Sequence, residues 1–484
     1  MSKFNGTTET ERLVKNLAGG TAFKVSAKLE LASLILTQFV QQQFFRTETQ
    51  MLERLYDLVE AIDDKQFAAK AAIYARHAFG MRSITHQLAA ILGFKVKRET
   101  WTKSFFEKVV RRPDDITEIL ACYIHRFGKP IPNSMKKGLG AAFAKFDGYQ
   151  LAKYRSARKA FSLIDAVNLL HPTPTDKNRE ALQALVQNKL RSTGTWETAL
   201  SQTGQIAAQD GLHEDKVLAL KKEAWAQLIY SHKLGYFALL RNLRNILEAC
   251  EDNDALLDAV LAQLVDPKLI ETSLVLPFRF ITALEAIEKT NFSGTKKVVE
   301  ALSQAVDIAL RNVPIFAGKT LVALDVSGSM QGRPATIGSL FAAALLKSND
   351  ADLMTFSDDA EYQTLNLQET TLSLARSIRF ASGGTNFHAI FKRANRKYNR
   401  IIILSDMQGW KGIGAPTSVF EEYKSQFKAS PKIYSFDLQG YGTLHFPEEE
   451  VYAIAGFSAK TFEVMKLLET DKHALIDSIE SQLL

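Results

Sequence analysis

The chain has 484 residues, of which 46% are hydrophobic and 23% are charged. This composition is typical of a folded protein with two or more domains and argues against a disordered chain. No run of 18 apolar residues and no secretory signal pattern is present, so we expect a cytoplasmic protein without a membrane span. Cys122 and Cys250 are too few for a disulfide framework or a cysteine-based zinc site, and we expect both to be buried thiols.

The net charge of +7 comes from the N-terminal part of the chain. Residues 1–310 contain about 42 Lys or Arg and about 34 Asp or Glu, whereas residues 311–484 contain about 18 and 19. The excess is densest from Lys95 to Lys159, where about 16 basic residues face about 6 acidic ones. Such a concentration of positive charge favours a polyanion as the partner.

Residues from about 25 to 310 have the pattern of successive helices. Apolar residues recur at three-and-four spacing, for example in residues 28–45 and 65–79. In residues 134–146 the same spacing places Leu139, Ala142, Phe143 and Phe146 on one helical face. Many helices of modest length with short connections predict helix pairs stacked as a solenoid.

After residue 311 short strands alternate with helices. The predicted strands are 320–325, 352–357, 400–406 and 432–438, and the predicted helices are 335–348, 385–398 and 459–469. Near-continuous apolar strands alternating with helices indicate a parallel, doubly wound α/β sheet. A sheet of this kind binds its ligands at the carboxyl ends of its strands.

The segment "DVSGSM" follows the first of these strands. Asp325, Ser327 and Ser329 offer one carboxylate and two hydroxyls, a set of hard oxygen ligands suited to magnesium. The same three residues could equally satisfy backbone groups at a strand-to-helix turn. Thr385 before a helix and Asp406 at another strand end complete the five-part set of a metal-ion-dependent adhesion site. We therefore predict a divalent metal, most simply magnesium, and a resemblance to the von Willebrand factor A domain.

Hydroxyl ligands would leave such a metal with an open position for a carboxylate or phosphate oxygen of a partner. No nucleophile or general base is evident beside these residues, so we do not expect an enzyme. The segment "AGKT" at 317–320 precedes its strand and lacks the upstream glycine of a phosphate loop, which argues against a nucleotide site.

Clustered cations in the N-terminal part are the candidates for contact with the phosphates of a polyanion. One helical face carries three of them at i, i+3 and i+4, namely Arg155, Arg158 and Lys159, and the preceding helix begins with Lys136 and Lys137. The other four are Arg111 and Arg112, which precede Pro113, and Arg241 and Arg244 in "LLRNLRN". A solvated basic face is the alternative for each residue, and Arg241 could instead hold a helix end. His86 could contact the same partner, but a structural role is more usual for a histidine at helical spacing.

The segments "NLAGGTAF", "GLGAAFAKFDGYQLAKYR", "LGYFALLRNLRNILE", "VLPFRFITALEAIE" and "FAGKTLVALDVSGSM" resemble, in this order, the Ro autoantigen family. That resemblance implies a TROVE module over residues 1–312, in which HEAT-like helical repeats close into a ring, and a von Willebrand factor A domain over residues 313–484. The length suits a bacterial or phage member. The alignment places Leu163 where the family often has a histidine associated with Y RNA binding.

The resemblance also implies partners. Small Y RNAs would bind a basic outer surface, and single-stranded 3′ ends of misfolded RNA would enter the central hole of a monomer. Bacterial relatives can tether polynucleotide phosphorylase, a 3′ exoribonuclease, through a Y RNA. Two hypotheses remain open: a non-catalytic RNA-binding protein, and a metal-dependent adaptor whose von Willebrand domain captures an acidic residue of a partner.

Overall fold

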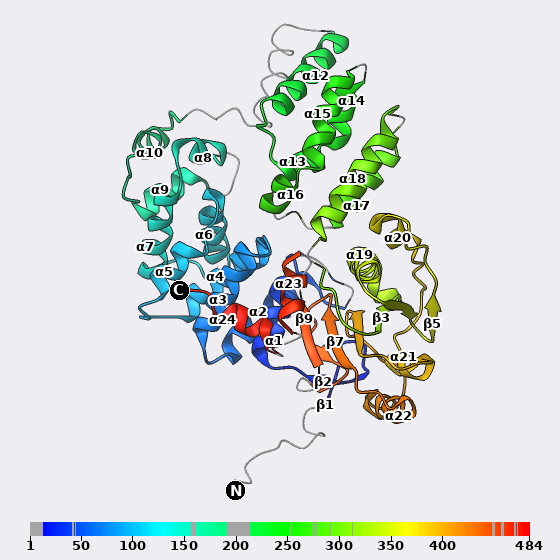
Figure 1. Ribbon diagram of the computed structural model, residues 1–484. Helices are drawn as coiled ribbons and strands as arrows, with labels where there is room; N and C mark the ends of the chain where they lie inside the picture. The colour runs from blue at the N-terminus through cyan, green and yellow to red at the C-terminus, as the bar shows by residue number, and fades with distance from the viewer. Residues whose placement is uncertain are drawn as a thin grey trace. The chain divides into compact units, whose positions relative to one another are not determined.

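The computed structural model describes most of the chain (Figure 1). The described residues are 13–40, 43, 45–155, 161–190, 213–251, 253–273, 275, 278–290, 292–311, 313–447, 451–455, 459–468, 471 and 473–484. They form two compact units. One unit combines the residues up to Ile84 with Leu310–Leu483, and the other runs from Thr85 to Ala309.

A six-stranded sheet is the centre of the first unit. Its strand order is β5-β4-β3-β6-β7-β9, with β3 (Thr320–Asp325), β4 (Ala351–Phe356), β6 (Arg400–Ser405), β7 (Lys432–Asp437) and β9 (Val451–Ala455) parallel and β5 (Ala360–Gln363) antiparallel at one edge. Every residue of β3 and β6 is buried, because helices cover both faces of a parallel sheet. The four predicted strands and the predicted parallel α/β sheet are confirmed.

Aromatic contacts identify the two helical layers on the sheet. Phe341 contacts both Phe436 of β7 and Phe462, with ring centroids 5.8 and 4.7 Å apart, so their helices share one face. Phe387 contacts Phe356 of β4 on the other face at 5.2 Å. The helices concerned are α19 (Arg333–Ser348) and α23 (Ala459–Leu468) on the first face, and α21 (Phe387–Arg393) with its neighbour α22 (Thr417–Phe427) on the second, while α20 (Thr371–Ser377) packs on α19.

The N-terminal residues belong to this same unit. A small antiparallel sheet joins β1 (Leu13–Lys15) and β2 (Thr21–Lys24) to β8 (Thr443–Leu444), and α1 (Ala27–Thr37) packs on β9, α2 (Glu48–Ala61) and α3 (Lys65–His77). The C-terminal helix α24 (Ala474–Glu480) packs on α3, and Lys28 forms a 2.6 Å ion pair with Glu480. Residues before Ile84 therefore pack with the C-terminal sheet, whereas the boundary at 312/313 remains a prediction about the family's modules.

The second unit is helical, as predicted. Its helices are α4 (Ser83–Lys95), which begins at the unit's boundary, α5 (Thr102–Lys108), α6 (Pro113–Phe127), α7 (Asn133–Ala142), α8 (Gly148–Lys153), α9 (Leu163–Leu170), α10 (Arg179–Val186), α12 (Glu214–Tyr230), α13 (Tyr236–Arg241), α14 (Leu243–Cys250), α15 (Asp254–Leu264), α16 (Pro267–Ser273), α17 (Phe278–Glu288) and α18 (Thr295–Ala309). Each packs mainly on helices near it in sequence, the arrangement of a stacked array.

Packing within this unit follows the predicted apolar faces. Leu139, Ala142, Phe143 and Phe146 are all buried. A Cβ added at Gly138 would lie 2.4 Å from a main-chain oxygen of α5, so the glycine permits the close approach of α7 to α5.

Two expectations from composition can be compared with the described residues. None of their helices is both long and apolar enough to cross a bilayer. Cys250 is buried and Cys122 is half-buried, neither is in a disulfide, and burial raises the pKa of each thiol to about 12. Both cysteines are thus poorly reactive thiols.

Candidate metal centre and basic surface

Three neighbouring strands, β3, β6 and β7, lead directly into the loops where the predicted metal site lies. Asp325 and Asp437 are the last residues of β3 and β7, and Asp406 follows β6. In each case the carboxylate accepts a hydrogen bond from the main-chain N–H two residues further on, at 3.0, 3.0 and 3.1 Å respectively. The three aspartates therefore shape three similar turns at the carboxyl edge of the sheet.

The five predicted metal ligands converge at this edge, and all five are buried. The hydroxyls of Ser327 and Ser329 lie 3.3 Å apart, and the hydroxyl of Ser329 also lowers the pKa of Asp406, which places it beside that carboxylate. Thr385 lies in the loop before α21, and its carbonyl accepts the N–H of Trp410, in the loop after β6, at 3.1 Å. The main chain of Gly383 joins the same loop to the loop after β3.

The electrostatics of the site favour a bound cation. Burial raises the pKa of Asp325 and of Asp406, and the negative charge of Asp325 raises the pKa of Asp406 further. The Oδ2 atom of Asp406 is buried and accepts no hydrogen bond from the described residues. Two buried carboxylates that repel each other are costly unless a positive charge lies between them. Burial also raises the pKa of Asp437, to about 6, but main-chain hydrogen bonds and the nearby buried guanidinium of Arg46 oppose this rise.

The donor set fits a hard divalent ion. It consists of carboxylate and hydroxyl oxygens, which magnesium prefers. Within the described ranges no group of three His, Cys, Asp or Glu side chains is positioned to hold a metal, so hydroxyl or other neutral oxygen ligands would have to supply part of any coordination shell. A site of nitrogen and sulfur ligands, as zinc would favour, is not what these residues offer.

Several residues that support the site were not identified in the sequence. Ser405 donates a 2.6 Å hydrogen bond to Asp325, and its position directly before Asp406 was the available signal. Asn16 donates to the carbonyl of Gly409 at 2.6 Å, and Gln408 accepts the N–H of Leu17 at 2.8 Å. No sequence signal links residues almost 400 positions apart, so the role of the N-terminal hairpin in holding this loop could not be predicted.

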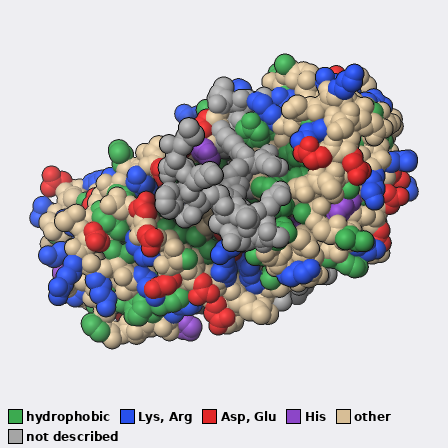
Figure 2. Space-filling model, turned by 90° about the horizontal axis from the view of Figure 1, so that it is seen from below, with side chains coloured by type: hydrophobic (Ala, Val, Ile, Leu, Met, Phe, Trp, Pro, Cys, Tyr) green, Lys and Arg blue, Asp and Glu red, His purple; other side chains and the backbone are tan. Residues whose placement is uncertain are grey.

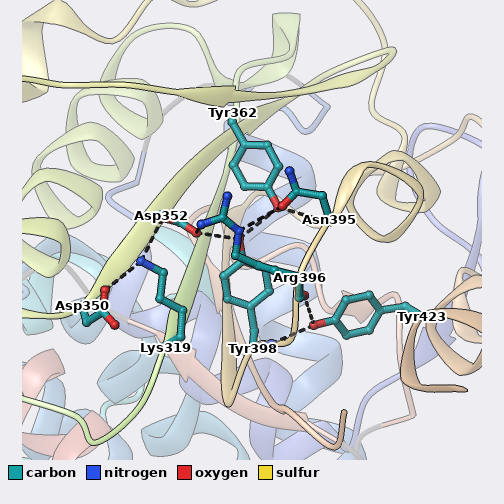
Figure 3. Close-up of polar contacts among 8 residues, drawn as sticks. All are labelled: Lys319, Asp350, Asp352, Tyr362, Asn395, Arg396, Tyr398 and Tyr423. Atoms are coloured by element: carbon teal, nitrogen blue, oxygen red, sulfur yellow. Dashed lines mark hydrogen bonds and ion pairs between the residues drawn. The ribbon is translucent and has the colours of Figure 1, made fainter. Parts of the chain in front are cut away.

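A second polar cluster lies at the opposite, amino edge of the sheet (Figure 3). Lys319 pairs with Asp350 and Asp352 at 2.7 and 3.0 Å. Tyr398 donates to Asp352 at 2.7 Å, and its hydroxyl lies 2.9 Å from that of Tyr362. These groups satisfy one another, which makes the cluster a structural network joining the starts of β3, β4 and β6. Lys319 is thereby engaged within this network.

The predicted RNA-contacting residues around α6 differ in how they are engaged. The carboxylate of Asp115, which is buried, accepts the main-chain N–H groups of Arg111 and Arg112 at 3.0 and 2.9 Å and lies 2.9 Å from His86. His86 is thus structural, as expected. The side chain of Arg112 makes two hydrogen bonds to Asp114 and stacks on a tyrosine ring, whereas Arg111 is exposed and has no side-chain partner among the described residues.

The remaining candidates also divide into engaged and free cations. Lys136 and Lys137 are the fourth and fifth residues of α7 and form no ion pair with described residues. Arg155 donates to the carbonyl of Leu190 and to Asn188 at 2.5 Å, so it holds the end of α10. Arg158 and Lys159 lie outside the described residues.

Three further positions complete the predicted set. Arg241 and Arg244 are both exposed, and Arg244 forms a 3.4 Å ion pair with Glu248. Leu163, at the position of the family's histidine, is buried at the start of α9.

The surface drawn in Figure 2 mixes charges of both signs: on that face Lys and Arg side chains are interspersed with Asp and Glu side chains. A binding surface for a polyanion must therefore be sought in particular groups of unpaired cations rather than in the net charge.

The family of the chain follows from a comparison with protein-family models. The TROVE domain matches residues 32–223 and 186–326, more than half of the chain. The chain belongs to the TROVE family. It is also similar to the RNA-binding protein RO60 of Deinococcus radiodurans, with 25% identity over 377 residues that cover 68% of this chain and 70% of that protein.

The chain is also similar to a second curated protein and to a solved structure. Telomerase protein component 1 of Mus musculus is 23% identical over 300 residues, which cover 47% of this chain but 11% of that much longer protein. The crystal structure of the Deinococcus radiodurans RO (RSR) protein superposes with a TM-score of 0.59 and 17% identity, covering 95% of this chain and 100% of that one. The chain is thus a distant relative of RO60 with the same fold, a helical region followed by a mixed, mainly parallel α/β sheet.

Proposed function

We propose that this TROVE protein is a non-catalytic RNA-binding protein that holds a small structured, Y-like RNA on a basic surface formed around α6 and α7. The observation that carries the proposal is the group of cations left without partners there, namely Arg111, Lys136 and Lys137. The positive charge of the surrounding segment and the similarity to an RNA-binding protein support it. Clustered unpaired cations gain free energy from the counterions that RNA releases on binding.

The resemblance to the Ro family extends this proposal. The helices close into a ring whose central hole accepts single-stranded 3′ ends of misfolded RNA, and the protein acts as a cytoplasmic monomer. Its role is RNA quality control, or the scaffolding of a 3′ exoribonuclease such as polynucleotide phosphorylase through the bound RNA. The buried carboxylates are engaged in turns and in mutual repulsion, which suits a metal clamp better than a hydrolytic centre.

The test is cross-linking of the protein to RNA in cells, followed by sequencing of the bound RNA. One dominant small RNA is expected if the structured RNA is the main ligand, together with a broad set of 3′ ends if misfolded RNA is captured as well. Purified protein incubated with labelled RNA and magnesium should leave the RNA at full length. Recovery of no RNA above the background of a mock sample, or magnesium-dependent shortening of the labelled RNA, would contradict the proposal.

A second function, metal-dependent capture of a partner protein, is favoured by the candidate metal centre. A bound magnesium ion would be held by Asp325, Ser327, Ser329, Thr385 and Asp406, and would supply positive charge and an open position for an outside carboxylate. In the loop beside it Trp410 is 49% exposed and Ile413 is 100% exposed. Exposed aromatic and aliphatic side chains next to a charged anchor are typical of protein-binding surfaces.

The two functions can be separated with one variant. Asp325→Ala should abolish magnesium-dependent partner capture and leave the affinity for structured RNA within a factor of two. Capture is measured by quantitative proteomics in magnesium and in EDTA, with Trp410→Ala as a variant that keeps the metal ligands. A set of partners that is the same in magnesium and EDTA would rule out the adaptor function.

A further inference from the structure

An exposed aromatic ring and two arginines meet on the helical unit, at α13 and α17. Phe237 is 46% exposed and lies four residues before Arg241, so both lie on one side of α13. From α17, the guanidinium carbon of Arg279 lies 5.6 Å from the centre of the Phe237 ring and 4.9 Å from that of Phe278. Phe237, Arg241 and Arg279 are hereafter the aromatic–arginine cluster.

No ion pair with a described residue balances the positive charge of this cluster. Neither Arg241 nor Arg279 forms an ion pair with any residue in the described part of the chain. Burial lowers the pKa of Arg279, and the nearby charge of Arg241 lowers it further, so the two cations repel each other. The sequence has no acidic residue between Glu223 and Glu248, which flank α13, and none between Glu271 and Glu285 around Arg279.

Two cations held together without a counter-charge favour an anionic ligand, and the exposed ring beside them indicates what else that ligand carries. Unpaired nucleobases stack on aromatic rings, while the phosphates that link them bind guanidinium groups. A duplex offers the phosphates but keeps its bases stacked inside the helix, so only a single strand can use both parts of the cluster. A carboxylate of a protein partner would engage the arginines and leave the ring unused.

We propose that the aromatic–arginine cluster binds single-stranded RNA, with an unpaired base stacked on Phe237 and a neighbouring phosphate between Arg241 and Arg279. The site is separate from the cations around α6 and α7, and the inference rests on the proposed RNA-binding function. It assigns the two kinds of RNA to different residues: structured RNA to the cations, and single-stranded RNA to the cluster.

The test uses the full chain and two fluorescein-labelled probes, an unstructured RNA of about ten nucleotides and an abasic ribose-phosphate oligomer of the same length, with affinity read by fluorescence anisotropy. Phe237→Leu should weaken binding of the RNA by about tenfold and change binding of the abasic probe by less than twofold, because it removes stacking and keeps an apolar side chain. Phe237→Tyr, which keeps an aromatic ring, should bind the RNA like the wild type.

The arginine variants test the phosphate contact. Arg241→Gln and Arg279→Gln should each weaken both probes and reduce the slope of log affinity against log salt by about 0.7, the value for one phosphate of a single strand. Lys289→Gln is the matched control, since Lys289 is exposed directly after α17 and lies ten residues from Arg279, and it should bind like the wild type. Circular dichroism melting establishes that each variant is folded.

The outcomes separate the two proposals. If the wild type binds structured RNA but Phe237→Leu binds the short RNA as tightly as the wild type does, the cluster is not the site and the proposed RNA-binding function stands. Equal affinity of the wild type for the RNA and the abasic probe would likewise overturn the stacking contact. If the wild type binds neither structured nor single-stranded RNA, both proposals fail.

Discussion

Neutralising the free cations around α6 and α7 should weaken the binding of structured RNA and flatten its dependence on salt. The variant combines Arg111→Gln, Lys136→Gln and Lys137→Gln. These three side chains have no ion-pair partner among the described residues, whereas Arg112 and Arg155 already bind protein groups. Replacing the three should therefore remove phosphate contacts without removing contacts that hold helices together.

The size of the effect follows from counterion release. Each phosphate contact contributes about −0.9 to the slope of log affinity against log salt for a duplex, so three contacts contribute about −2.7. Over a rise in salt from about 50 to about 200 mM, the wild type should then lose about 40-fold more affinity than the triple variant. At low salt the two proteins should differ most.

The assay is anisotropy of a labelled structured RNA titrated with each protein at four salt concentrations. A matched control replaces three exposed, unpaired cations of the α/β domain, Lys392→Gln, Arg393→Gln and Lys466→Gln, and removes the same amount of charge. If the control flattens the slope as much as the triple variant does, the attraction comes from net charge alone. An unchanged slope in the triple variant would refute the assignment of these residues to the RNA surface.

Three other predictions concern the stability of the domain that carries the metal site. Asp406→Asn should raise the melting temperature in EDTA, because it removes a buried charge. It should also abolish the increase in melting temperature that magnesium causes in the wild type. If magnesium still raises the melting temperature of the variant, Asp406 is not a ligand. Gly442→Ala should lower the melting temperature more than Gly414→Ala does. Both glycines have positive φ, so each substitution strains the backbone. A Cβ at Gly442 would in addition lie 2.2 Å from the carboxyl carbon of Glu30, whereas a Cβ at Gly414 would meet nothing within 4 Å. Burial lowers the pKa of His445 to about 3, well below its unfolded value of about 6.5, so the stability due to its neutral ring is complete above about pH 6.5 and falls as the pH decreases. From pH 7 to 5 this loss should be about 2 kcal/mol in the wild type and absent in His445→Gln, as followed by urea unfolding at each pH; equal pH dependence of the two proteins would show that another group is responsible.

The central part of the fold could be predicted because its strands are buried on both faces. β3 and β6 each contain a run of four consecutive apolar residues, and that pattern identified them together with the parallel arrangement of the sheet. β5 is a four-residue edge strand with only one buried residue, so its sequence carries little strand signal. The packing of α1 and α24 within one unit depends on contacts between the two ends of the chain, and local patterns do not encode such contacts.

The candidate sites show the same division. The residues of the candidate metal site could be selected because three of them lie in one six-residue segment, and the other two follow recognisable strand and helix signals; that they bind a metal remains a prediction. The candidate RNA surface could be selected only as a region. Charge counts do not reveal that Arg112 is paired with Asp114 or that Arg155 binds the end of α10, and these contacts decide which cations remain available to RNA.

The structural and the metal-binding interpretations of "DVSGSM" are compatible, because a carboxylate oxygen can accept more than one bond. Asp325 uses one oxygen to accept the N–H of Ser327 and the other to accept the hydroxyl of Ser405, which fixes the position of the carboxylate before any metal binds. Asp406 uses only Oδ1 in its turn, and its Oδ2 is left without a donor. A cation would therefore be bound by groups that the turns have already positioned, and it would offset the repulsion that those turns create. The turn is thus a requirement of the proposed metal site rather than an alternative to it.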